Sequence, residues 1–195
     1  MLENVVDVEE SMIDASLRDL PHVAWFFDFK AAFPSIAHSY LKKVLAKLGC
    51  PHWLLNFVDC LYDNTRCSIS LEGRLFEGFP QKAGIRQGCP LSPLLFITAI
   101  EPFLRKLWDL PGMKTVRAYA DDIAAVARFN QETVKALEVC FTNFAEISGM
   151  GLNFPKTIGV PLFRDQLGDT VARLTNWSPG WAGVTLDFKA KYLGF

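Results

Sequence analysis

The chain has 195 residues, of which 50% are hydrophobic and 21% are charged, and its formal net charge is −1. This composition supports one sizeable hydrophobic core in a single domain and excludes an intrinsically disordered chain. The near-neutral charge lacks the basic surplus that nucleic-acid-binding domains usually carry, so composition alone argues against a nucleic-acid partner.

Targeting and cysteine patterns indicate where the protein works. The first twenty residues are acidic rather than basic and apolar, so they do not resemble a secretory signal peptide. No apolar run reaches the roughly 18 to 20 uncharged residues of a membrane span, so we expect no membrane partner. The five cysteines are odd in number and lack zinc-ligand spacing, which favours free thiols in a reducing compartment. We therefore expect an intracellular protein of the cytoplasm or nucleus that is not secreted; no pattern indicates its oligomeric state.

The first predicted elements are a strand and a helix. Residues 22–29, HVAWFFDF, form an apolar and aromatic run with Asp28 near its end, which is typical of a buried strand. Ser35 is expected to cap a helix that continues to Leu48, and Gly49 is expected to end it.

The next segment predicts a second helix followed by a hairpin. Pro51 suits the first position of a helix over 51–63. From 66 to 82 the apolar residues tend to alternate with polar ones, and Glu72-Gly73 has the composition of a turn. This pattern favours a surface hairpin.

Two long helices and another hairpin are predicted further along the chain. Residues 92–108 have a helical pattern in which Pro102 predicts a kink or a break. Residues 115–128 are expected to form the hairpin. Asn130 should cap the amphipathic helix that follows, and Gly149 should end it.

The C-terminal part of the chain has weaker patterns. Residues 157–163 are a candidate strand interrupted by Pro161, and we expect two short strands within 181–195. In chain order, the elements fit an α+β domain with a ferredoxin-like split βαβ antiparallel sheet and helices on one face. This topology places the strand over 22–29 beside the hairpin over 115–128.

Two adjacent carboxylates, Asp121 and Asp122, lie within the apolar stretch AYADDIAAVARF. Such a pair can form a hairpin turn, because Asp tolerates turn geometry and can cap nearby amides. Alternatively, a hard divalent cation such as Mg²⁺ can turn the repulsion between the carboxylates into shared attraction. The two interpretations differ in whether a third carboxylate arrives, and the expected topology brings Asp28 next to the pair.

Five motifs follow one another over residues 22–195: FDFKAAF, GIRQGCPLSPLLF, YADD, SGMGLNFPKT and KYLG. Together they resemble the palm motifs of reverse transcriptases, and they are most similar to those of non-LTR retrotransposons. The resemblance implies a polymerase palm over 22–195, with 1–21 as a remnant of the fingers, in one reverse-transcriptase domain fragment over 1–195. The fingers would then be partial and the thumb missing, which would account for the near-neutral charge.

The resemblance also implies roles for single residues. Asp28, Asp121 and Asp122 correspond to the catalytic aspartates, which together with the Phe29 carbonyl would hold two Mg²⁺ ions, or Mn²⁺ in their place. Phe33 corresponds to the aromatic residue under the sugar of the incoming nucleotide, where a ring leaves no room for a 2′-hydroxyl. A plain core role for Phe33 is the alternative.

Further residues match motifs that contact the nucleotide, the template and the primer. Gln87 and Gly88 correspond to the loop that approaches the nucleotide and the template. Arg86 could meet a phosphate or the template backbone, with a solvated surface charge as the alternative. Lys156 corresponds to the lysine that protonates the leaving pyrophosphate. The primer grip would begin at Tyr192, Leu193 and Gly194.

These correspondences lead to one principal function and two alternatives. The principal function is that of an RNA-directed DNA polymerase of a retroelement, which adds deoxynucleotides to a DNA primer on an RNA template by two-metal nucleotidyl transfer. The 195-residue chain alone would have little activity, because it would lack fingers and thumb to hold primer and template. The first alternative is a non-catalytic relic or repurposed palm that binds nucleic acid or acts as a scaffold. The second is an RNA-dependent RNA polymerase, which Phe33 disfavours.

Overall fold

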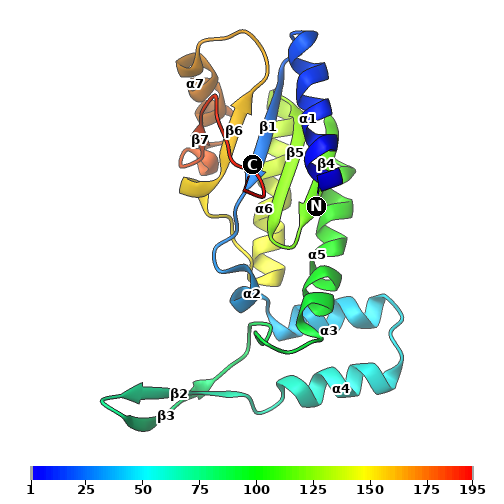
Figure 1. Ribbon diagram of the computed structural model, residues 1–195, viewed down its shortest axis with the longest axis vertical. Coiled ribbons are helices and arrows are strands. Elements are labelled where there is room, and N and C mark those ends of the chain that lie inside the picture. The colour runs from blue at the N-terminus through cyan, green and yellow to red at the C-terminus, as the bar shows by residue number, and fades with distance from the viewer. Residues whose placement is uncertain (1, 195) are drawn as a thin grey trace.

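A five-stranded sheet forms the centre of the structure, a computed structural model that describes residues 2–194 (Figure 1). The strands are β1 (His22–Phe27), β4 (Met113–Tyr119), β5 (Asp122–Arg128), β6 (Ile158–Pro161) and β7 (Thr185–Leu186), in the order β4-β5-β1-β6-β7. From β4 to β6 all neighbours pair antiparallel, in the strand order of a ferredoxin-like split βαβ unit, and β7 adds a parallel edge. The expected α+β palm topology is therefore confirmed.

The central strand β1 is apolar on both of its faces. Trp25 and Phe27 pack into the core on one face, whereas Ala24 and Phe26 pack on the other, because side chains alternate along a strand. The buried residues 123–127 of β5 repeat this two-sided pattern. Each face of the sheet must therefore be covered by other parts of the chain.

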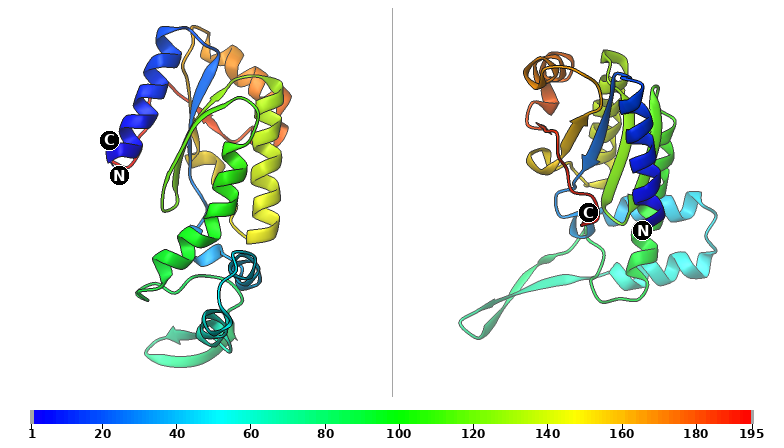
Figure 2. Two further views of the ribbon diagram at one scale, coloured as in Figure 1. Left: turned by 90° about the vertical axis from the view of Figure 1, so that its right-hand side faces the viewer. Right: turned by 45° about the horizontal axis from the view of Figure 1, so that its top comes forward.

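Helices α5 (Ser92–Trp108), α6 (Gln131–Ser148) and α7 (Leu167–Trp177) cover the first face. Figure 2 shows α5 and α6 on this side of the sheet. Aromatic rings fill the interface: Trp25 meets Trp181 edge-on with 5.5 Å between ring centroids, and Phe27 lies 4.4 Å from Phe141. This aromatic layer forms the main core of the protein.

The ends of these helices test the sequence-based boundaries. The Asn130 side chain accepts a hydrogen bond from the Thr133 amide at 2.8 Å, and Gly149 ends α6 with a φ of 83°, both as predicted. Helix α5 continues through Pro102 as one helix, so of the kink or break expected there the break does not occur. Helix α7 lies where the sequence gives no clear pattern, because it contains Gly168 and has no side-chain cap. None of the helices within residues 2–194 is long and apolar enough to cross a membrane.

Helix α1 (Leu2–Leu17) covers the opposite face of the sheet (Figure 2), so the expectation of helices on one face is wrong. Val8 of this helix is buried beside Ala124. Ala15 is buried beside Ala24 and Val126, on the same face of the sheet. The physical reason is the two-sided apolar pattern of β1 and β5, which requires a second apolar cover. The division of the chain into palm and fingers remnant stays a prediction.

Four polar contacts fasten α1 to the edge strand β4, and we call them the α1–β4 polar row. Asn4 donates to the Ala118 carbonyl at 2.9 Å, Asp7 pairs with Arg117 at 2.7 Å, Ser11 bonds Thr115, and Asp14 pairs with Lys114 at 2.5 Å. The four α1 residues recur every three or four positions, so they lie along one side of the helix. The row fixes the strand that leads into the Asp121-Asp122 turn.

The segment between β1 and α5 extends beyond one end of the sheet (Figure 1). It contains α2 (Ala32–Ser35), α3 (His38–Lys47), α4 (His52–Tyr62) and a hairpin of β2 (Arg66–Leu71) and β3 (Arg74–Pro80). The hairpin turns at Glu72-Gly73 as predicted, with φ values of 50° and 75°. Pro51 caps α4 from outside, rather than occupying its first position.

The predicted helix cap at Ser35 is wrong. The Ser35 hydroxyl donates to the carbonyl oxygens of Lys30 and Ala31 at 3.0 and 2.8 Å, so it closes the single turn of α2. Helix α3 begins only at His38, after a stretch of extended backbone. Its end before Gly49 is as predicted.

The C-terminal part has one strand within the described residues, β7, rather than the expected two. The 3₁₀ turns Phe154–Lys156 and Pro179–Trp181 precede it. Residues 192–194 form a turn, with φ values of 54° at Leu193 and 89° at Gly194. Backbone of this left-handed kind does not continue a strand.

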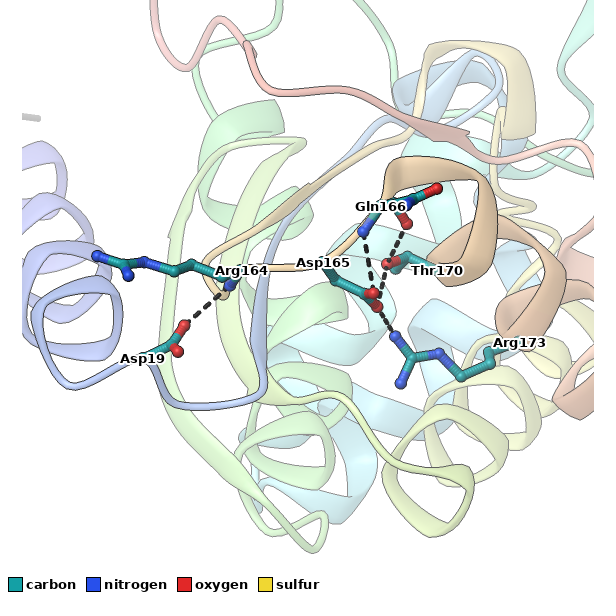
Figure 3. A network of polar contacts seen from close by, with 6 residues as sticks. All are labelled: Asp19, Arg164, Asp165, Gln166, Thr170 and Arg173. Atoms are coloured by element: carbon teal, nitrogen blue, oxygen red, sulfur yellow. Dashed lines mark hydrogen bonds and ion pairs between the residues drawn. The ribbon is translucent and has the colours of Figure 1, made fainter.

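A polar network joins the segment after β6 to the segment after α1 (Figure 3). Asp19 accepts a hydrogen bond from the Arg164 amide at 2.8 Å, and the adjoining Asp165 pairs with Arg173 of α7. The Arg173 guanidinium also lies 5.5 Å from the centroid of the Phe129 ring. The network therefore links α7, which sequence reasoning missed, to the segment between α1 and β1 and to the residue that follows β5.

Gly49 and Gly149 offer a matched test of how helix ends contribute to stability. A Cβ at Gly49 would meet no atom within 4 Å, whereas a Cβ at Gly149 would overlap the Ser35 carbonyl. We predict that Gly49→Ala lowers the free energy of unfolding by about 1 kcal/mol, the strain of left-handed backbone. Gly149→Ala should lower it by about 2 kcal/mol or more, because the overlap adds to that strain. Urea unfolding measures both, and equal losses would contradict the packing at Gly149.

Candidate active site

The register between β1 and β5 brings two of the predicted carboxylates together. Phe27 pairs with Ile123 at the end of the ladder, so the next positions along the same register are Asp28 and Asp122. Both residues therefore stand at one end of the sheet, on neighbouring strands.

The turn between β4 and β5 holds Asp121. Tyr119 pairs with Asp122 across the hairpin, and Ala120 has a φ of 52° between them. Left-handed backbone in a two-residue connection is the geometry of a tight hairpin. Tyr119 is 51% exposed and so does not belong to the core. Both interpretations of the Asp pair share this turn. The register brings Asp28 beside the pair, as the topology predicted, and the metal-binding role of the three carboxylates stays a prediction.

The three carboxylates influence one another electrostatically. Partial burial raises the pKa of Asp122, and the negative charges of Asp121 and Asp28 raise it further. In the part of the chain that the structure describes, no three acidic, His or Cys side chains converge closely enough to enclose a metal ion. The oxygen atoms of the three carboxylates are the donors that a hard divalent cation prefers.

The segment after α6 holds the backbone of Asp28. The Asp28 amide donates to the Thr157 hydroxyl at 3.4 Å, and its carbonyl accepts from the Asn153 amide at 2.8 Å. Thr157 is fully buried, and sequence reasoning missed it because a threonine after a turn carries no distinctive pattern. The predicted Lys156 precedes it and is exposed, with no ion pair among residues 2–194.

The backbone of Phe29, whose carbonyl is a predicted metal contact, is held on one side by the segment after α6. Phe29 forms an antiparallel bridge with Leu152, and the hydrogen bonds of this bridge come from the flanking residues Asp28 and Lys30. In such a bridge the central residue directs its own amide and carbonyl to the opposite side, which here is the side of β5. No backbone hydrogen bond between loops of the described chain ends on the Phe29 carbonyl, which leaves it available to a ligand.

A cavity of about 410 Å³ lies along the loop between β3 and α5. It brings together Phe33, Gln87 and Gly88, which are three of the residues predicted to bind the nucleotide. Cys89 also lines it, although the sequence identified this residue only as a free thiol. The Phe33 ring stacks on Phe96 with 4.2 Å between centroids. Phe33 is therefore both a core side chain and part of the cavity wall.

The loop that lines the cavity is fixed to the turn after β1. The Gly84 amide donates to the Ile36 carbonyl and the Ile85 amide to the Phe33 carbonyl, each at 2.8 Å. Gly84 has a φ of 100°, and a Cβ there would lie 3.0 Å from the Pro34 carbonyl oxygen, so a glycine is required. These bonds set the distance between the loop and Phe33.

Arg86 does not line this cavity. Its guanidinium donates to the Thr65 hydroxyl at 3.1 Å, in the short segment between α4 and β2. The predicted contact between Arg86 and a phosphate or the template backbone stays a prediction, and it would require the guanidinium to leave Thr65.

The predicted primer-grip segment begins close to the carboxylates, on the α1 face of the sheet. Tyr192 is buried with Val8 and Ala124, and its ring lies 5.7 Å from that of Phe26. Burial raises the pKa of Tyr192 to about 12, and the charge of Asp122 contributes to the rise. The role of this segment in holding a primer stays a prediction.

The family model described as reverse transcriptase (RNA-dependent DNA polymerase) matches residues 6–195. The chain belongs to the reverse transcriptase family. Reverse transcriptases generally use divalent metal ions, which agrees with the oxygen donors at this end of the sheet.

Relatives of this reverse transcriptase domain come from retroelements. A Pol polyprotein of the type-1 retrotransposable element R2 from Bradysia coprophila is 34% identical over 192 residues, which is 91% of this chain and 21% of the relative. The R2DM polyprotein of Drosophila melanogaster is 31% identical, over 68% of this chain and 13% of the relative. An uncharacterized protein of transposon TX1 from Xenopus laevis is 30% identical, over 76% of this chain and 14% of the relative. The chain thus spans between 13 and 21% of these relatives, which confirm the non-LTR type.

Solved structures show the same fold. Apo telomerase from Candida tropicalis superposes with a TM-score of 0.61 at 15% identity, over 82% of this chain and 32% of that one. Telomerase from the same organism in complex with a fragment of telomeric RNA has a TM-score of 0.59 at 16% identity, over 81% of this chain and 29% of that one. The central sheet and its helices are thus those of a polymerase palm.

We predict that Asp122→Asn stabilises the reverse transcriptase domain at neutral pH. The raised pKa means that folded Asp122 binds its proton more readily than the unfolded chain does, whose value is near 3.8. The loss of folding stability caused by the Asp122 charge is therefore absent at low pH. It develops as the pH rises through the raised pKa of the folded state. The melting temperature of the variant should exceed that of the unsubstituted chain by about 1 to 3 °C at pH 7 and by nothing below about pH 3.5.

The control for this experiment is Glu10→Gln, which removes an exposed charge in the middle of α1, away from both helix ends. Its melting temperature should follow that of the unsubstituted chain at both pH values. A gain for Asp122→Asn that is the same at both pH values would show that the effect is not one of charge.

Proposed function

We propose that this domain is the palm of an RNA-directed DNA polymerase of a retroelement, which extends a DNA primer with deoxynucleotides on an RNA template. The observation that carries the proposal is the arrival of Asp28 beside Asp121 and Asp122 at one end of the sheet. Membership of the reverse transcriptase family and the retroelement relatives support it. Replication of such an element takes place on nucleic acid inside the cell, which supports a location in the cytoplasm or nucleus.

The catalytic groups have distinct tasks. Asp28, Asp121, Asp122 and the Phe29 carbonyl would hold two Mg²⁺ ions, or Mn²⁺ in their place, which when bound activate the primer 3′-hydroxyl and stabilise the leaving pyrophosphate. The β1–β5 register keeps the carboxylates on two adjoining strands, so their backbones are positioned before any substrate binds. Lys156 is exposed on the segment that holds Asp28, and in this proposal its ammonium would give a proton to the leaving group.

The cavity beside Phe33 suits the sugar and base of an incoming nucleotide. Phe33 supplies a flat apolar wall, which would exclude a 2′-hydroxyl. Gly88 has a φ of 83°, and a Cβ there would meet no atom within 4 Å, so its backbone borders open space. Gln87 adds an amide that can bond to the nucleotide or the template.

Phe33→Val tests the choice of a DNA precursor. We predict that this change, in a polymerising protein that carries the domain, raises ribonucleotide incorporation and modestly lowers that of deoxynucleotides, because only the ribose clash is relieved. A shift of about tenfold in the ratio of kcat/KM values corresponds to about 1.4 kcal/mol. Loss of the ring stacked on Phe96 should also lower stability, by about 2 kcal/mol.

Phe96→Leu is the matched control for Phe33→Val, since Phe96 is the other ring of the stack and does not line the cavity. It should lower the melting temperature and leave the ratio between the two sugars unchanged. An unchanged ratio in Phe33→Val would return Phe33 to a core role and weaken the proposal of a DNA-making enzyme.

Metal binding tests the carboxylate cluster directly. We predict that calorimetric titration of the 195-residue chain detects binding of Mg²⁺ or Mn²⁺, and that Asp121→Asn weakens it at least about tenfold because one ligand is lost. Asp109→Asn removes an equal charge elsewhere and should have no effect. Equal affinity in Asp121→Asn and the unsubstituted chain would exclude a shared site and favour the non-catalytic palm.

A further inference from the structure

Helices α3, α5 and α6 surround a cavity of about 760 Å³, and none of the residues that line it belongs to the candidate active site. Its floor consists of the buried side chains Tyr40, Val44, Phe103 and Phe144. The rings of Phe103 and Phe144 stack with 4.2 Å between their centroids, and the Tyr40 hydroxyl donates to the Ala99 carbonyl. Internal packing therefore fixes this apolar floor before any partner binds.

Two apolar side chains that line the same cavity are exposed. Leu48, directly after α3, is 55% exposed, and Ile147 of α6 is 60% exposed. A single exposed apolar side chain is ordinary, but these two border a floor that is itself apolar. They extend the apolar surface from the floor to the rim, where a second apolar surface can cover it.

Three lysines stand around this surface. Lys43 and Lys47 lie one turn apart on α3, and Lys106 belongs to α5. All three are exposed, and none of the ion pairs among residues 2–194 includes them. In the described part of the chain, Glu146 of α6 is the one acidic residue that lines the cavity. The rim therefore carries a net positive charge, and we call the space the lysine-rimmed cavity.

The combination of an apolar floor and separate cations discriminates between kinds of occupant. The phosphates of a nucleic acid would meet the lysines but leave the apolar floor uncovered, and Glu146 would repel them. A fatty acid would cover the floor, but its single carboxylate would match only one of three lysines on two helices. A helix with an apolar face and carboxylates beside that face covers the floor and pairs with the lysines at once.

We propose that the lysine-rimmed cavity is a docking site for an acidic amphipathic helix of a partner protein. Apolar side chains of that helix pack on the floor and bury the exposed parts of Leu48 and Ile147, while its carboxylates pair with the three lysines. The inference goes beyond the proposed function, because it gives the domain a protein partner at a place that shares no residue with the cavity beside Phe33.

Two synthetic peptides test the chemistry of the partner on the 195-residue chain. The first is a fluorescein-labelled helix with leucine on one face and glutamate on the others, and the second has lysine in place of every glutamate. Fluorescence anisotropy should detect binding of the acidic peptide, and the basic peptide should bind at least about tenfold more weakly because the three lysines repel it. Equal affinity for the two peptides, or no binding of the acidic one, overturns the proposal.

Ile147→Ala and Val139→Ala are a matched pair that locates the peptide. Both side chains are exposed on α6, at 60% and 56%, but only Ile147 lines the lysine-rimmed cavity. Neither change should lower the melting temperature, since alanine favours a helix and little packing is lost. Ile147→Ala should weaken binding of the acidic peptide about fivefold, and Val139→Ala should leave it unchanged. Equal affinities in the two variants would place the peptide elsewhere and overturn the proposal.

Charge reversal tests the lysines. Lys43→Glu with Lys47→Glu should weaken binding of the acidic peptide and strengthen binding of the basic one, a gain that a damaged fold would not produce. Lys189→Glu, a reversal of an exposed charge after β7, is the control and should leave both affinities unchanged. An equal effect of Lys189→Glu would show a general influence of net charge and overturn the proposal. Displacement of the acidic peptide by a short single-stranded oligouridylate would assign the cavity to nucleic acid and overturn it as well.

Discussion

The pairing of β1 with β5 is the constraint on which the site depends. It places Asp28 opposite Asp122 at the end of an apolar sheet, where partial burial and the neighbouring charge of Asp121 act against ionisation. Such an arrangement lowers the stability of the folded chain, and the apolar side chains of β1, buried on both faces, offset it. The destabilising carboxylates therefore lie at one end of β1 and β5, and the apolar side chains that offset them lie along the rest of the same two strands.

Segments that are distant in the sequence hold this end of the sheet in place. The backbone of Asp28 is bonded to Asn153 and to the buried Thr157, so the strand end cannot shift independently of the segment after α6. The loop with Gln87 is bonded in turn to the residues that follow Asp28, through the Phe33 carbonyl. The carboxylates and the cavity are consequently one assembly, whose parts are related by backbone hydrogen bonds rather than by long side chains.

Sequence patterns predict the elements whose signals are local. β1, the β4–β5 hairpin and α6 follow from apolar periodicity, the Asn130 cap and Gly149. Ser35 shows the limit, because a serine caps a helix only from extended backbone, and here it lies inside the turn of α2. The carboxylates and cavity residues could be predicted through the resemblance to reverse transcriptases. Their supports could not: Thr157 acts on Asp28 from 129 residues away, and nothing in the local sequence records that contact.

The α1–β4 polar row has a consequence for the order in which the protein is made. Its contacts join residues 100 to 114 positions apart, so α1 leaves the ribosome long before the strand that receives it. At about 5 to 20 residues per second, the helix waits for roughly 5 to 20 seconds with its apolar side uncovered. During that interval the uncovered apolar side is exposed to aggregation, and α1 can dock on β4 only after that strand has been made.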